Sequence, residues 1–261
     1  MYSVSTNNAM AFKLKLIFQL VIYLSWHHML CTGIGERIVG GSSVTEKKYT
    51  YFVRVHYEGI LWCGGSLVRN NAVVTAAHCV SDVNVKELRV HADTISLRDE
   101  GIVRQVKKVV ISSLYNERTT NYDVAVLILA SAIPNSSFTP IQLQKTPVAA
   151  GTKCLVIGHG NTKENGKIPT QLQEVWVPVL SRNVCQRRYA GVARITRSML
   201  CAWESGKDSC GGDSGGPMVC NGQQAGIVSW GVECADSRYP GVYTDISSVY
   251  TFIVRTLQRY Q

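Results

Sequence analysis

The feature of this chain that most restricts its fold is a series of short aliphatic runs separated by turn residues. Each run is four to six residues long and is bounded by glycine, asparagine and serine, which is the pattern of strands joined by turns. Because no amphipathic helices separate the runs, the pattern argues against an α/β sheet and predicts an all-β fold of barrels or a sandwich. The clearest runs are residues 51–55, 72–75, 124–129, 154–157 and 225–229.

Only the C-terminal segment, at about residues 248–259, has a helical pattern. Ser247 or Ser248 is the expected N-cap, and the apolar residues that follow share one face. We expect so short a face to dock on the protein body rather than on a membrane. The face consists of Val249, Phe252, Ile253 and Leu257.

A polar break at residues 134–137 divides the chain into two β-rich halves. Its proline, asparagine and serines make it the best candidate for a linker. Asn135 also begins an N-x-S sequon, so the asparagine is either a glycosylation site or an ordinary turn residue.

The first 33 residues have the pattern of a signal peptide. Lys13 and Lys15 precede an apolar run at 16–26, which is long enough for a signal core and short for a membrane span. A membrane anchor is the alternative, but polar Gln19 interrupts the run. We therefore expect a secreted product, with the exact signal cleavage site left open.

Nine cysteines in a chain with a secretion signal predict disulfides, because extracellular compartments do not keep thiols reduced. Cys31 falls in the leader and leaves eight, which allow on the order of a hundred pairings, so counting alone does not choose among them. Zinc binding is the competing explanation, but no paired C-x-x-C and no H-E-x-x-H motif occurs. The eight are Cys63, Cys79, Cys154, Cys185, Cys201, Cys210, Cys220 and Cys234.

Ser214 lies among glycines in the segment 211–217, where main-chain amides can approach a reacting carbonyl. A neutral serine is a weak nucleophile and needs a base, which in turn needs an orienting group. His78 in a small-residue setting and Asp123 at the start of an aliphatic strand are candidates. Taken singly, the histidine fits a structural role and the aspartate fits a turn.

Together these residues resemble the chymotrypsin family of serine proteases, specifically its trypsin-like branch, and the chain has an insect-like character. The resemblance extends from residue 38 to about 260 and rests on six motifs in the family's order. They lie at residues 38–41, 75–79, 123–125, 208–217, 229–231 and 240–243.

The resemblance implies two six-stranded antiparallel β-barrels, with the active site between them and a C-terminal helix. The N-terminal barrel would span about 38–135 and the C-terminal barrel about 136–246. It also implies a set of disulfides that uses all eight mature cysteines. The implied pairs are Cys63 with Cys79, Cys154 with Cys220, Cys185 with Cys201 and Cys210 with Cys234.

The implied chemistry is peptide hydrolysis by Ser214, with His78 as base and Asp123 holding the histidine. The amides of Gly212 and Ser214 would form the oxyanion hole. Asp208 would lie at the base of a pocket for arginine or lysine, because a buried carboxylate needs a cation. Further residues of the implied substrate site are Ser209, Ser229, Trp230, Gly231 and Gly241, with Tyr189 beside them. The resemblance implies no cofactor and no metal.

The bond between Arg37 and Ile38 resembles an activation site, with residues 34–37 as a short activation peptide. In the family the new amine at the Ile38 position pairs with the acid that matches Asp213, so we expect a zymogen. Because Arg37 suits the enzyme's own pocket, autoactivation is a hypothesis.

Three departures from the family stand out. His159 occupies a position where trypsins usually have tryptophan, which puts local packing in question. Gly211 replaces a commoner polar residue, and together with Glu233 it would alter neighbouring subsites. The family's calcium loop has no good match, because the spacing of Asp93, Asp99 and Glu100 favours solvated loop acids.

Without residues 1–37 the chain keeps 24 basic and 17 acidic residues, a net charge of +7. Its basic clusters are either a solvated surface or an exosite for acidic substrates or sulfated glycans. They lack the interleaved aromatics of nucleic-acid binders. The clusters are Lys107 with Lys108, and Arg187 and Arg188 with Arg194 and Arg197.

The expected partners are protein or peptide substrates with Arg or Lys at the cleavage site and protein protease inhibitors. Neither nucleic acid nor, after signal removal, a membrane is expected, and the enzyme is expected to be a monomer. The competing function is that of a catalytically silent homologue acting as a binding or regulatory module.

Overall fold

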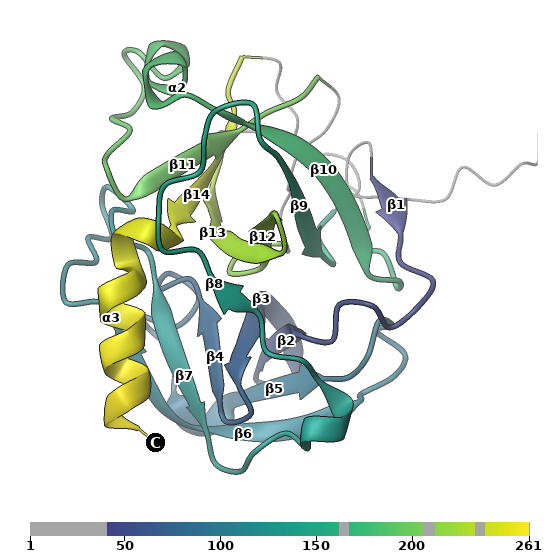
Figure 1. Cartoon of the computed structure of the whole chain (residues 1–261). Coiled ribbons are helices and arrows are strands. Elements are labelled where there is room, and N and C mark those ends of the chain that lie inside the picture. The colour runs from purple at the N-terminus through teal and green to yellow at the C-terminus, as the bar shows by residue number, and fades with distance from the viewer. Residues whose placement is uncertain (1–40, 162–166, 206–211, 233–237, 261) are drawn as a thin grey trace, which may run out of the picture. The chain divides into compact units, whose positions relative to one another are not determined.

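The computed structural model describes residues 41–161, 167–205, 212–232 and 238–260 (Figure 1). As predicted, the chain is mostly strand and forms two six-stranded antiparallel β-barrels with a C-terminal helix. Among the described residues, no helix is long and apolar enough to cross a membrane.

The first barrel is closed and antiparallel between all neighbouring strands. Its strands, in order around the barrel, are β2 (Phe52–Tyr57), β3 (Ile60–Arg69), β4 (Ala72–Thr75), β7 (Ala125–Leu129), β6 (Ile102–Ile111) and β5 (Leu88–Ala92).

The second barrel closes through the pairing of its strands β9 and β12. Around this ring lie β9 (Lys153–Gly158), β10 (Gln173–Leu180), β11 (Met199–Ala202), β14 (Gly241–Asp245), β13 (Gln223–Trp230) and β12 (Pro217–Cys220). Two short strands join from outside: β1 (Ser42–Ser43) pairs with β10, and β8 (Gln142–Leu143) runs parallel to β13. The segment around Ser42 thus precedes the first barrel in sequence but pairs with the second.

Burial explains which strands were visible in the sequence. Strands β4 and β7 are buried along their whole length and therefore read as continuous aliphatic runs. Strand β10 instead alternates between buried and more exposed positions. Its Gln173 and Pro178 interrupt the apolar pattern, which is why the sequence did not mark it as a clear strand.

The C-terminal helix α3 (Ile246–Arg259) packs on the first barrel, in the same apolar cluster as β7. Figure 1 shows α3 in yellow beside that strand. Val249, Ile253 and Leu257 of the predicted face are buried, and Phe252 is partly buried against the same cluster.

The predicted N-cap of this helix was wrong, because the cap is Asp245 rather than Ser247 or Ser248. The Asp245 carboxylate accepts a hydrogen bond from the Ser247 main-chain N–H at 2.9 Å. This carboxylate satisfies a first-turn amide that has no partner within the helix, so the helix begins as soon as β14 ends.

A second helix, α2 (Arg182–Arg188), was missed. It has few apolar residues and therefore no helical periodicity. Its stability comes instead from Ser181, which accepts a hydrogen bond from the Val184 N–H at 3.3 Å, and from the disulfide between Cys185 and Cys201. Two single-turn 3₁₀ helices complete the elements: η1 (Val85–Glu87) and η2 (Asn135–Ser137), the second within the predicted linker.

Three disulfides join described residues, and all three are pairs that the resemblance implies. They are Cys63 with Cys79, Cys154 with Cys220 and Cys185 with Cys201. The fourth implied pair, Cys210 with Cys234, lies outside the described residues.

Candidate active site

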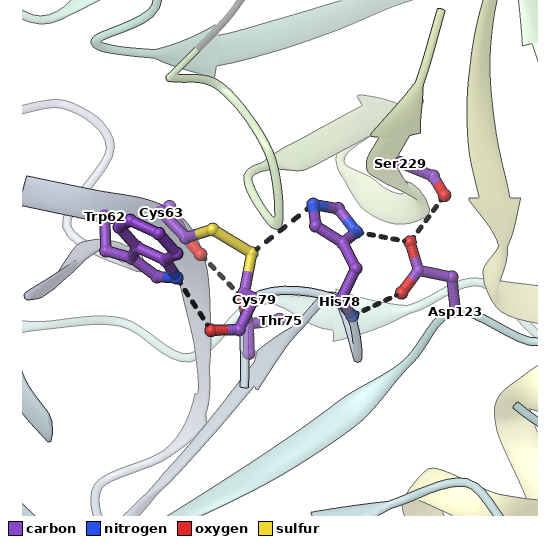
Figure 2. The surroundings of a disulfide bond; sticks show 8 residues. Trp62, Cys63, Thr75, His78, Cys79, Asp123 and Ser229 are labelled. Atoms are coloured by element: carbon purple, nitrogen blue, oxygen red, sulfur yellow. Dashed lines mark hydrogen bonds and ion pairs between the residues drawn. A yellow bond between two sulfur atoms is a disulfide. The ribbon is translucent and has the colours of Figure 1, made fainter. Parts of the chain in front are cut away.

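His78 and Asp123 lie on the loops after β4 and before β7, two strands that pair directly in the first barrel. This pairing brings together residues that are 45 positions apart. His78 Nδ1 lies 2.8 Å from Asp123 Oδ2, and the His78 main-chain N–H donates to Asp123 Oδ1 at 2.9 Å (Figure 2). The carboxylate therefore fixes both the backbone and the ring of the histidine.

The second barrel supplies further donors to Asp123. Ser229 Oγ on β13 donates to Asp123 Oδ2 at 2.6 Å, and Thr244 Oγ1 on β14 donates to the Asp123 main-chain oxygen at 2.8 Å. The Asp123 side chain is 0% exposed, whereas the His78 side chain is 30% exposed. The Ser229 hydroxyl thus helps to satisfy the buried carboxylate, while the histidine ring stays accessible.

The contacts of Asp123 also fix the tautomer of His78. An ionised carboxylate only accepts hydrogen bonds, so Nδ1 of His78 carries the proton and Nε2 of the neutral ring is an acceptor. Nε2 lies 3.7 Å from Cys79 Sγ. Within the described part of the chain, no hydrogen bond joins Nε2 to the Ser214 hydroxyl, a contact that often forms only when substrate is bound.

The sulfur atoms beside His78 do not form a metal site. Cys63, His78 and Cys79 lie close enough together to hold an ion. The two cysteines are bonded to each other, however, and a cysteine binds zinc only as a free thiolate.

The turn around Ser214 is fixed by contacts with both barrels. The main-chain oxygen of Ser214 accepts from the Gly64 N–H at 2.8 Å, and the Gly215 N–H donates to Val228 O at 2.8 Å. Gly215 has a φ of +79°, and a Cβ there would lie 2.2 Å from Thr75 Oγ1. Only glycine fits this position, so the residue after the candidate nucleophile is determined by the packing of the turn.

Asp213, the neighbour of Ser214, is also 0% exposed. Its Oδ1 accepts from the Gly160 N–H at 2.7 Å. A Cβ on Gly158 would lie 2.0 Å from Oδ1, and one on Gly160 would lie 2.2 Å from Oδ2. The two glycines therefore form a cradle that touches the carboxylate and leaves no room for a methyl group.

His159, between these glycines, replaces the tryptophan of the family pattern with a buried imidazole that is 1% exposed. Its Nδ1 lies 3.4 Å from Pro169 O, and its Nε2 has no hydrogen-bond partner among the residues that the structure describes. Burial, with smaller contributions from the charges of Arg54 and His56, lowers the pKa of His159 to about 4. The ring is therefore neutral at physiological pH.

Residues of the expected calcium-loop region instead surround an arginine. Arg54 is 2% exposed, and its guanidinium donates to Ser96 O at 3.0 Å and to Asp99 O at 2.6 Å. The Asp99 carboxylate accepts from the Gly101 N–H at 3.0 Å. The guanidinium of Arg54 thus binds the carbonyl oxygens of this loop and holds the loop against β2.

Part of the expected substrate site lies among the described residues. The Trp230 ring packs edge-on against Tyr189, with 5.1 Å between ring centroids, and the Tyr189 hydroxyl donates to Pro240 O at 2.6 Å. Gly231 follows the tryptophan, and Gly241 begins β14. Arg37, Ile38, Asp208, Ser209, Gly211 and Glu233 lie outside the described residues.

Sequence reasoning missed Thr244, although it holds the main chain at Asp123. It also missed Ser198, whose Oγ accepts from the Tyr122 N–H at 3.1 Å and donates to the Asn121 side chain. Both join segments that are distant in sequence, and a hydroxyl residue within or beside a strand carries no local signal of such a role.

Two β-barrels with an acid–histidine pair on one and a glycine-flanked serine on the other are the arrangement of the chymotrypsin-type serine endopeptidases, one of several folds that carry such residues. The family model described as Trypsin matches residues 38–253. The chain therefore belongs to the trypsin family of serine proteases.

Curated relatives from vertebrates and flies resemble the chain to a similar degree. Trypsin II-P29 of Gallus gallus is 41% identical over 230 residues, covering 86% of this chain and 91% of the relative. Hypodermin-A of Hypoderma lineatum is 40% identical, covering 84% and 86%. Trypsin alpha of Drosophila melanogaster is 39% identical, covering 84% and 87%. These identities place the chain in the family without separating insect from vertebrate members.

Proposed function

We propose that this chain is a secreted endopeptidase, made as a zymogen, that hydrolyses peptide bonds after arginine or lysine through Ser214, His78 and Asp123. The observation that carries the proposal is the buried Asp123 carboxylate, which holds His78 by two hydrogen bonds while the histidine ring stays accessible. This arrangement prepares a neutral imidazole with its free nitrogen available as a base.

In the proposed reaction, His78 Nε2 takes the proton of the Ser214 hydroxyl as its oxygen attacks the scissile carbonyl carbon. The amides of Gly212 and Ser214 bind the resulting oxyanion, a contribution of about 3 to 4 kcal/mol for one donor in related sites. The protonated histidine then gives its proton to the leaving amine, the C–N bond breaks and an acyl ester remains. Water, deprotonated by His78, hydrolyses this ester and restores the serine.

Specificity for arginine or lysine rests on Asp208 and on the resemblance to trypsins. Asp208 lies six residues before Ser214, the family's position for the carboxylate at the base of the pocket, with Ser209 beside it. Gly231 and Gly241 would leave the pocket shaft open. An apolar substrate side chain would leave the buried charge unpaired, which costs several kcal/mol.

Zymogen control is proposed for the bond between Arg37 and Ile38. Cleavage would release an amine at Ile38 that pairs with Asp213 and orders the oxyanion hole. The tight enclosure of the Asp213 carboxylate by Gly158 and Gly160 supports this role, because a carboxylate held away from water interacts strongly with an incoming cation. The leader at residues 1–33 and the disulfides support secretion.

The direct test uses proenzyme cleaved after Arg37, with Ile38 verified as the new N-terminus. We expect an organophosphonate to label Ser214, and peptides with Arg or Lys before the cleaved bond to be preferred over matched leucine peptides by about a thousandfold or more in kcat/KM. Correctly processed, folded protein that is neither labelled nor active would contradict the proposal and favour the silent-homologue alternative. An Arg37→Gln proenzyme should stay inactive, and its activation would refute the assigned cleavage site.

A further inference from the structure

A groove of about 900 Å³ lies beside the candidate active site and is lined by positive charge. Four arginines contribute to its walls, and the lining residues that the structure describes include no aspartate or glutamate. Its principal lining residues are Arg118, Asn121, Arg182, Arg194, Arg197 and Trp230.

Hydrogen bonds tie the walls of the groove together. Thr196 Oγ1 donates to Asn121 Oδ1 at 2.7 Å, which joins the loop before β7 to the loop before β11. On the same side, Arg182 of α2 donates to Arg197 O at 3.1 Å. The groove is therefore built by three segments that hold one another in place, and each of them carries at least one arginine.

The groove adjoins the residues proposed for catalysis and for the specificity pocket. Asn121 stands two positions before Asp123, and Trp230 lies between Ser229, which binds Asp123, and Gly231. In the proposed function, Gly231 bounds the pocket for the residue that precedes the cleaved bond. A groove that shares Trp230 with this pocket would meet the residues that come shortly before that one.

Within the described ranges, no carboxylate forms a salt bridge with the arginines of the groove. Arg118, Arg182, Arg194 and Arg197 are exposed and form no ion pair among the described residues. Glu117, although next in sequence to Arg118, is likewise not paired with it. Several cations in a concave, partly apolar wall focus their field and raise the local concentration of anions.

Resting on the proposed function, we propose that this groove selects substrates with aspartate or glutamate two to four residues before the cleaved arginine or lysine. Guanidinium groups bind carboxylates through paired hydrogen bonds, and a peptide entering the specificity pocket would place its preceding residues beside Trp230. An acidic peptide is favoured over a sulfated glycan because the groove is continuous with the proposed substrate site.

The test compares two peptides that differ only in glutamate or glutamine two to four residues before the cleaved arginine. At about 50 mM salt we expect kcat/KM to favour the glutamate peptide about tenfold, and at about 500 mM salt about twofold, because salt screens exposed charges. In Arg194→Gln/Arg197→Gln enzyme the low-salt preference should fall to about twofold. The ratio of the two peptides is the readout, since it cancels effects on the chemical step.

Lys107→Gln/Lys108→Gln is the matched control, because it removes the same charge from exposed positions on β6 that line a different groove. This variant should keep both its activity and the full preference for glutamate. If both double variants lost the preference for glutamate equally, the preference would come from the net charge of the protein. The proposal of local recognition by the groove would then be wrong.

The outcomes separate this inference from the proposed function. An enzyme that cleaves the glutamine peptide but shows no preference for glutamate overturns the groove while leaving the proposed function intact. If neither peptide is cleaved, the proposed function fails. The groove can then be tested alone by fluorescence anisotropy, which measures the binding of a labelled acidic peptide to wild type and to Arg194→Gln/Arg197→Gln. Equal binding to the two proteins would contradict the proposed role of the groove. Heparin retention that needs these arginines, without any peptide preference, would assign the groove to glycans and overturn the proposal.

Discussion

Two carboxylates among the described residues are fully buried, Asp123 on the first barrel and Asp213 on the second, and their surroundings differ. The Asp123 carboxylate accepts hydrogen bonds from the main-chain N–H and Nδ1 of His78 and from the Ser229 hydroxyl. The Asp213 carboxylate accepts from the Gly160 N–H, and the backbone of Gly158 and Gly160 also lies in close contact with it. Hydrogen bonds hold the carboxylate of Asp123, whereas the carboxylate of Asp213 is also held by close steric contact with the backbone.

This difference determines which changes each site tolerates. Deleting one donor from a hydrogen-bond network removes part of its effect, and the remaining donors still hold Asp123. Adding one methyl group to a surface already in contact forces main-chain movement. We therefore expect changes at Asp123 to impair catalysis in a protein that still folds, and changes at the cradle of Asp213 to impair folding itself.

The largest expected effect is that of Asp123→Asn on activity. The asparagine fits the same space but no longer favours the Nδ1–H tautomer of His78, a change that costs about 10⁴ in kcat in serine proteases studied this way. Activated enzyme assayed on an arginine peptide should lose activity by about this factor, while its melting temperature changes little.

Ser229→Ala is the matched variant for Asp123→Asn, because it removes only the 2.6 Å hydrogen bond to Oδ2. Losing this one donor should reduce kcat about tenfold or less. If Ser229→Ala were as damaging as Asp123→Asn, the network would act as a single unit, and the view of Asp123 as held by separable donors would be wrong.

The next largest effect concerns the fold. In Gly160→Ala the new Cβ would lie 2.2 Å from Asp213 Oδ2, and we expect a loss of about 3 kcal/mol or more in the free energy of unfolding. Urea denaturation of the proenzyme measures this loss without interference from autolysis.

Gly231→Ala is its control, since a Cβ there meets nothing within 4 Å. This variant should change the free energy of unfolding by less than about 0.5 kcal/mol. It should nevertheless reduce cleavage after arginine if Gly231 bounds the pocket. Similar urea midpoints for Gly160→Ala and Gly231→Ala would show that the backbone around Asp213 can move to accept a methyl group. The difference between the Asp213 and Asp123 sites would then not be one of shape.

The sequence pattern predicted an all-β fold because several strands are buried along their whole length, and the family resemblance added the two barrels. Strand β4 coincides with the predicted run 72–75, and the apolar face of α3 was visible in its periodicity. Helix α2 and the Asp245 cap were not predicted, because a disulfide and a single carboxylate stabilise them and neither produces a repeating pattern.

For the site, the sequence marked His78, Asp123 and Ser214 through their surroundings, and the family resemblance gave them roles. It gave no indication of Thr244, whose bond to the Asp123 main chain joins residues 121 positions apart. The cradle made by Gly158 and Gly160 was equally hidden. The first contact depends on how the two barrels meet and the second on how distant segments of one barrel pack, and no local run of residues encodes either.

The smallest of these effects is the pH dependence of stability caused by His159, which lies between the two cradle glycines in the sequence. Its pKa of about 4 in the folded protein is below the value near 6.5 expected for the unfolded chain. The unfolded state therefore binds more protons between these values. The contribution of His159 to the free energy of unfolding is therefore complete above about pH 6.5 and is lost as the pH falls towards 4. Between pH 7 and pH 5 the loss is about 2 kcal/mol.

His159→Phe and His159→Asn both remove this titration, although they differ in size and polarity. Urea unfolding of the proenzyme at pH 7 and pH 5 should show that each variant loses about 2 kcal/mol less than wild type on acidification. A residual slope is expected from His56, because burial also lowers its pKa to about 4. If both variants lost as much stability between pH 7 and pH 5 as wild type does, His159 would not contribute to the pH dependence. It would then have to accept a proton in the folded state as readily as in the unfolded state. The segment that carries the cradle glycines would then tolerate a buried charge, and its difference from the polar network at Asp123 would be smaller than the geometry suggests.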